Sequence, residues 1–106
     1  MKPRNHRTAE LQALAYHRLV ARRLDRPIVN DARRRLRRWR KDGRIHPRWA
    51  DEWESILALP LPRIAKLISA DSEQARELRQ TSPFAGVLTE QERRRLLRVV
   101  EERARA

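Results

Sequence analysis

Cysteine is absent from this sequence, and glycine occurs only twice in 106 residues. Without cysteine, the chain can form no disulfide and can offer no thiolate to a metal. With two glycines it has few of the residues that tight β-turns favour. No uncharged run approaches the roughly 20 residues needed to cross a bilayer, and the first six residues do not resemble the apolar region of a signal peptide. We therefore expect a soluble, cytoplasmic protein with no membrane association.

Helix-favouring residues dominate what is present, chiefly Ala, Leu, Arg and Glu. No segment alternates apolar and polar side chains as a strand would. The pattern predicts an all-α protein, a compact single domain of five to six short helices over residues 9–106, preceded by a basic flexible arm at 1–8. The predicted helices cover about residues 9–24, 30–42, 47–59, 62–69 and 71–80, with a last one after Thr89. The first helix is apolar around most of its circumference, so we expect it at the centre.

Helix boundaries are marked by capping residues and prolines. Pro27 is expected to stop the first helix, Asp71 to cap the helix over 71–80, and Thr89 with Glu92 to form a capping box. Between these last two helices, Phe84 is expected to anchor a loop in the core.

The basic residues are unevenly distributed. Residues 1–48 hold 16 Lys and Arg against 4 Asp and Glu, whereas residues 49–106 hold 10 of each. The first half therefore supplies the whole net charge of +12. This asymmetry favours a negatively charged partner for one side of the fold.

The segment 29–44 carries the strongest signal. At 100° per residue, its apolar residues fall within a narrow arc that should face the core, namely Val29, Ala32, Leu36 and Trp39. The candidate partner-binding or nucleic-acid-binding residues are the cations of this segment: Arg33, Arg34, Arg35, Arg37, Arg38, Arg40, Lys41 and Arg44. Four of them lie opposite the apolar arc and should point outward: Arg34, Arg37, Arg38 and Lys41.

Three interpretations of this helix remain open. Guanidinium groups neutralise phosphates and can fork onto guanine in a major groove, which favours DNA or RNA. The same groups form bidentate pairs with carboxylates, which favours an acidic protein surface. The third interpretation is a solvated basic helix without a partner.

A candidate helix-turn-helix lies across residues 62–80. Apolar residues fall at suitable positions on both sides of a turn at 69–70. The residues available to contact DNA would be Ser72, Arg76 and Gln80. The turn lacks a glycine, and the second helix exposes three carboxylates that would repel phosphate, so two short packed helices are the simpler interpretation.

Catalytic groups do not converge in the sequence. His6, His17 and His46 are scattered, and no two stand at a metal-ligand spacing. No glycine-rich phosphate loop or nucleophile elbow is present. We expect no enzymatic activity, no cofactor and no metal.

The stretch Arg79-Gln-Thr-Ser-Pro-Phe-Ala-Gly-Val-Leu, preceded by Trp49 and Trp53 and by Tyr16-His-Arg-Leu-Val-Ala-Arg, resembles a segment of small uncharacterised bacterial proteins of about this length. Those proteins look like the small partner in toxin–antitoxin or phage-defence gene pairs. The resemblance implies an antitoxin-like regulator that binds and neutralises a larger protein and contacts operator DNA. It implies no catalytic residues, and it leaves the oligomeric state open, a homodimer included.

Overall fold

The computed structural model describes the backbone of residues 3–105 and the side chains of residues 7–105. Over this range the protein is all-α, as predicted, with six helices and no strand. The helices are α1 (Pro3–Arg23), α2 (Arg26–Asp42), α3 (Pro47–Leu57), α4 (Leu61–Ile68), α5 (Glu73–Arg79) and α6 (Glu90–Arg105).

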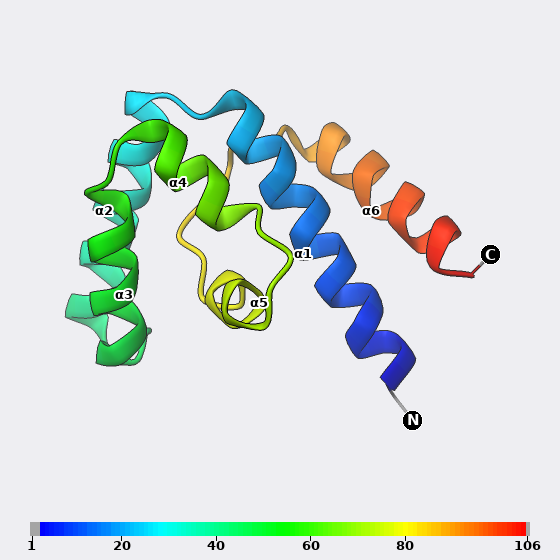
Figure 1. The fold of residues 1–106 in the computed structure, drawn as a ribbon, viewed down its shortest axis with the longest axis horizontal. Helices are drawn as coiled ribbons and strands as arrows, with labels where there is room; N and C mark the ends of the chain where they lie inside the picture. The colour runs from blue at the N-terminus through cyan, green and yellow to red at the C-terminus, as the bar shows by residue number, and fades with distance from the viewer. Residues whose placement is uncertain (1–2, 106) are drawn as a thin grey trace.

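Helix α1 is the centre of the arrangement, which confirms the prediction from its apolar circumference. It packs against α4 and α5 on one side and α6 on the other, while α2 packs against α3 (Figure 1). Helix α6 lies alongside α1 at the edge of the molecule (Figure 1). The cationic helix α2 therefore belongs to the part of the fold farthest from α6.

Trp53 of α3 lies at the heart of the core, with no exposed surface. Its indole Nε1 donates hydrogen bonds to the Leu78 carbonyl, 3.2 Å away, and to Thr81 Oγ1, 3.0 Å away. Phe84 is also buried and meets the Trp53 ring edge-on, with ring centroids 6.0 Å apart. The loop after α5 is thus anchored in the core by Phe84, as the sequence predicted.

Helix boundaries differ from prediction at three places. Helix α1 begins at Pro3, so the expected arm at 1–8 is already helical from that residue, and residues 1–2 lie outside the described part. Pro27 falls in the first turn of α2, where a missing N–H costs nothing, and Asp25 provides the cap. Ser72, not Asp71, caps α5, because its hydroxyl accepts the Ala75 N–H.

The predicted capping box at the start of α6 is confirmed. Glu92 accepts the backbone N–H of Thr89 at 2.9 Å, and Thr89 Oγ1 accepts that of Glu92 at 3.0 Å. Glu92 also receives two hydrogen bonds from Arg23, at 3.1 and 2.7 Å. One carboxylate therefore both caps α6 and ties it to the end of α1.

None of the helices in residues 3–105 is long and apolar enough to span a bilayer. Within the same range, no group of three or more His, Asp or Glu side chains is placed to hold a metal ion.

Candidate nucleic-acid interface

Helix α2 is fixed at both ends. Asp25 accepts the Ile28 N–H at 2.9 Å, and Gly43 ends the helix in the left-handed conformation, at φ 70°. A side chain at that φ would be strained, which explains glycine at this position. The predicted inward arc is confirmed: Val29, Ala32 and Leu36 are buried, and Trp39 packs against the core while half-buried.

Two of the candidate cations make hydrogen bonds within the fold. Arg33 donates to the Leu57 carbonyl at 3.3 Å, and Arg35 donates to the Pro83 carbonyl at 2.8 Å. Both side chains are half-buried at the flanks of the apolar arc. These hydrogen bonds engage one nitrogen of each guanidinium and hold both side chains against the fold, so less of their charge is presented to a partner.

Two further candidates are ion-paired within the molecule. Arg40 faces α3 and pairs with Asp51 at 2.9 Å and with Glu54 at 3.1 Å. Arg34 is paired with Asp31, one turn earlier on α2. The charge of Arg40 is therefore compensated on the side of α3, whereas Arg34 stays on the outer surface with part of its charge compensated.

Three candidates point outward without compensation. Arg37, Arg38 and Lys41 are exposed, and none of them has an ion-pair or hydrogen-bond partner among the described side chains. Together with Arg34 they stand at positions i, i+3, i+4 and i+7, which places them on one side of the helix. We call these four residues the α2 face.

The α2 face contains no apolar side chain. Among residues 7–105, the exposed large hydrophobic side chains are Leu67 on α4 and Val99 on α6. The α2 face is thus a cationic surface without an apolar side chain, bordered by the exposed Asp31 carboxylate that pairs with Arg34.

Arg44, the last candidate, lies just beyond the helix end and is exposed. It lines a cavity of about 340 Å³ together with Trp39, Ile45 and residues 80–82. Arg44 is therefore an exposed cation on the side of Trp39, which packs against the core.

The three candidate helix-turn-helix residues lie on and around α5. Ser72 uses its hydroxyl to cap α5, Arg76 pairs with Asp71 at 3.8 Å, and Gln80 is exposed at the C-terminal cap. The exposed residues around α5 include three carboxylates, Asp71, Glu73 and Glu77. The α5 surface therefore offers DNA little positive charge, in contrast to the α2 face.

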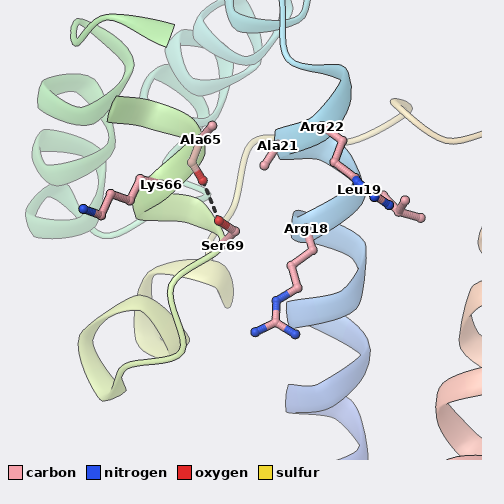
Figure 2. A pocket seen from close by; sticks show the side chains of 7 residues that line it. All are labelled: Arg18, Leu19, Ala21, Arg22, Ala65, Lys66 and Ser69. Atoms are coloured by element: carbon pink, nitrogen blue, oxygen red, sulfur yellow. Dashed lines mark hydrogen bonds between the residues drawn. The ribbon is translucent and has the colours of Figure 1, made fainter. Parts of the chain in front are cut away.

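A basic groove that the sequence reading missed lies between α1 and α4. This cavity of about 490 Å³ is lined by Arg18, Leu19, Ala21, Arg22, Ala65, Lys66 and Ser69 (Figure 2). Ala21 points toward α4, but the charged ends of Arg18, Arg22 and Lys66 lie well apart (Figure 2). The i, i+4 spacing of Arg18 and Arg22 places them on the same face of α1. The charged ends of the three cations nevertheless lie too far apart in Figure 2 to form one anion site.

The burial of Arg79 is a second feature that the sequence did not predict. Its side chain is only 5% exposed, and burial lowers the pKa of its guanidinium, an effect that the Asp71 carboxylate partly opposes. The one feature of the sequence that indicates its burial is its position directly after Leu78, on the buried side of a short helix.

Comparisons with protein-family models, with curated proteins and with solved structures gave no match. Function can therefore be inferred only from the geometry and charge of the residues described above.

Proposed function

We propose that this protein binds the phosphate backbone of a nucleic acid through the α2 face. The observation that supports the proposal is the row Arg34, Arg37, Arg38 and Lys41, exposed on one side of a helix whose opposite side is anchored in the core. Such cations bind phosphates by neutralising them and releasing counterions.

The composition of the α2 face favours nucleic acid over an acidic protein. Protein interfaces depend on a few buried aromatic or apolar anchors surrounded by a polar rim. The α2 face has no such anchor. Protein–DNA interfaces, in contrast, are polar and strongly positive.

The length of the α2 face also favours nucleic acid as the partner. From Arg34 to Lys41 the helix rises about 10 Å, a length over which one DNA strand carries about three phosphates. The face can therefore reach about three phosphates at once.

A salt titration tests the proposal. Binding of the intact chain to a fluorescent 20-base-pair duplex and to a single strand of equal length is measured between about 50 and 200 mM salt. We expect the slope of log K against log salt to flatten by about 3 in the variant Arg37→Gln, Arg38→Gln, Lys41→Gln. The control variant Arg95→Gln, Arg98→Gln, Arg105→Gln removes the same charge from exposed positions of α6.

The control decides between a site and a general charge effect. If both triple variants flatten the slope equally, binding follows net charge and the proposed interface is wrong. If the wild-type chain binds neither nucleic acid, the proposal fails outright.

A second candidate function is the antitoxin-like binding of a larger protein, and α6 favours it. None of the 16 residues of α6 is buried, and Val99 is 42% exposed. The cavity of about 390 Å³ between α1 and α6 has a largely apolar lining that includes Leu11, Leu14 and Val100. This surface offers the apolar anchor that the α2 face lacks.

Co-expression with the product of the neighbouring gene tests this second candidate. We expect the two chains to elute together on size exclusion, and Val99→Glu to separate them. Leu67→Glu, a matched change at the exposed hydrophobic residue of α4, should leave them together. Separate elution of the wild-type chains would rule out this partner.

A further inference from the structure

Two cavities lie along α1 and share one lining residue, Arg18. The cavity of about 490 Å³ lies between α1 and α4, and the cavity of about 390 Å³ lies between α1 and α6. Helices α4 and α6 lie on opposite sides of α1 (Figure 1). We call the two cavities together the α1 groove. Between Leu11 and Arg22, which line its two ends, α1 rises about 16 Å, the length of three helical turns.

The part of the α1 groove next to α6 is apolar. Leu11, Ala15 and Val100 line it and are half-buried, so each keeps some contact with water, and Leu14 is buried. Apolar side chains of another molecule that cover this surface would remove it from water, which is favourable. This part of the groove therefore favours an occupant with apolar side chains over a purely polar one.

The α1 groove is also basic, and its charge is not compensated. Four exposed cations line it, and none of them has an ion-pair or hydrogen-bond partner among the described side chains: Arg18, Arg22, Lys66 and Arg103. Among residues 7–105, no carboxylate lines either cavity. The groove therefore complements an occupant with negative charge.

The spacing of the cations fits a helix better than a small anion. The charged ends of Arg18, Arg22 and Lys66 lie well apart (Figure 2), so one small anion cannot contact them all. Arg18 and Arg22 stand one turn apart, about 6 Å along the axis of α1. Two carboxylates at positions i and i+4 of another helix are separated by the same rise. A helix that lies along α1 can therefore pair with both arginines.

The apolar part of the groove decides between a protein helix and a nucleic acid. Leu11, Ala15 and Val100 offer a phosphate backbone no side-chain donor. The α2 face differs in this respect, because it contains no apolar side chain. A helix that binds in a groove brings apolar anchors spaced one turn apart together with polar neighbours, and such a helix matches both parts of the α1 groove.

We propose that the α1 groove binds an acidic amphipathic helix of a partner protein. The apolar side chains of that helix lie against Leu11, Ala15 and Val100, and its carboxylates pair with Arg18 and Arg22. This proposal rests on the second candidate function, the binding of a larger protein, and adds the chemistry of the bound segment. It does not depend on the α2 face.

Two synthetic peptides of about 16 residues, long enough to form a helix, test the proposal on the intact chain. Both have the same composition of Leu, Ala and Glu. In the first peptide Leu forms one stripe and pairs of Glu stand at i and i+4, whereas in the second the order is scrambled. Binding is measured by fluorescence anisotropy at about 0.15 M salt, which screens distant exposed charges. We expect the amphipathic peptide to bind at least tenfold more tightly than the scrambled one.

Charge reversal locates the bound peptide. The variant Arg18→Glu, Arg22→Glu changes two exposed positions, and the Trp53 Nε1–H resonance reports whether its core stays folded. We expect it to weaken binding of the amphipathic peptide at least tenfold. The matched control Arg37→Glu, Arg38→Glu makes the same change in net charge on α2 and should weaken binding less than threefold.

A cavity-filling variant tests the apolar part of the groove. Ala104→Phe places a ring in the cavity between α1 and α6 from an exposed position of α6. We expect it to weaken binding of the amphipathic peptide at least fivefold. Ala58→Phe, at an exposed alanine just after α3, should leave binding unchanged.

Four outcomes would overturn the proposal. They are equal binding of the two peptides, an equal loss in the two charge-reversed variants, unweakened binding in Ala104→Phe, and an oligonucleotide of about 16 thymidines that loses as much affinity as the peptide from Arg18→Glu, Arg22→Glu. The last result would make the groove part of a nucleic-acid surface.

The peptide experiment is independent of the neighbouring gene product. Co-elution that Val99→Glu abolishes, together with no peptide binding, would leave the second candidate function in place and remove only this proposal. Peptide binding without co-elution would support the groove and rule out that partner.

Discussion

His17 Nε2 lies 2.7 Å from Ser82 Oγ, which joins the middle of α1 to the loop after α5. The Ala13 carbonyl beside Nδ1 can only accept, so neutral His17 carries its proton on Nδ1 and its Nε2 accepts the Ser82 hydroxyl proton. Ser82 Oγ in turn accepts the Phe84 backbone N–H at 3.1 Å. His17 Nδ1 donates to the Ala13 carbonyl at 2.7 Å. The imidazole is only 4% exposed, and burial lowers its pKa from 6.5 to about 4.

This pKa shift predicts that the fold weakens in mild acid. In the folded protein His17 stays neutral down to about pH 4, whereas in the unfolded chain it binds a proton below about pH 6.5. The unfolded state therefore gains protons first, and stability falls as the pH drops from 6.5 to 4, by about 3 kcal/mol in all. Chemical denaturation at pH 7, 5.5 and 4 measures this loss.

A variant isolates the contribution of the histidine. His17→Gln keeps a hydrogen-bonding side chain but cannot titrate, so its unfolding free energy should change much less over the same interval. An equally steep decline in the variant would show that other groups cause the acid sensitivity.

The indole hydrogen bonds of Trp53 predict a costly Trp53→Phe substitution. The change removes one of the donors to the Leu78 carbonyl, removes the donor to the Thr81 hydroxyl and opens space in a fully buried site. We expect a loss of about 2–3 kcal/mol. Trp49→Phe is the matched control, because Trp49 is half-buried and its ring is stacked by the Arg48 guanidinium at 4.8 Å. Urea unfolding should show a clearly smaller loss for Trp49→Phe.

The division of the α2 cations into fold-supporting and outward residues can be tested by a pair of substitutions. Arg35→Gln removes the donor to the Pro83 carbonyl and should cost about 1–2 kcal/mol. Arg37→Gln removes an exposed cation and should change stability by less than about 0.5 kcal/mol. Equal effects on the denaturation midpoint would contradict this division.

Glu92 should control how firmly α6 is attached. Hydrogen bonds from Arg23, followed by that from the Thr89 backbone, lower the pKa of Glu92 to about 2. Its contribution is therefore present above about pH 4.5 and is lost as the pH falls toward 2. Glu92→Gln at neutral pH should speed amide exchange across residues 90–105 severalfold and leave α3 unchanged. Glu101→Gln, at an exposed carboxylate of the same helix, is the control.

Local patterns predicted the helices well because their signals are short-range. The inward arc of α2 and the Thr89–Glu92 capping box each depend on residues within one or two turns. The first helix does end before Pro27, but the same reasoning began the second helix at residue 30 instead of Arg26, since a proline that ends one helix also fits the first turn of the next. The structure decides between these two positions, because Asp25 caps α2 and Pro27 then falls in its first turn.

The interface was harder to predict because an arginine looks the same in sequence whatever it contacts. Arg33, Arg35 and Arg37 are near neighbours on one helix, yet the first two reach carbonyls of other segments and the third reaches solvent. The hydrogen-bond partners of Arg79 could not be predicted from its neighbours in sequence, because they are carbonyls of residues 68 and 70, and residues of α1 lie beside it.

By itself, the sequence determined that this chain is helical, where its apolar stripes run and that its positive charge is concentrated before residue 49, because these properties follow from residue type and spacing. The tertiary structure alone decided which cations of α2 are compensated within the fold and that Arg79 is buried. The physical reason is that hydrogen bonds and ion pairs to distant segments depend on how the helices pack, which no local spacing encodes.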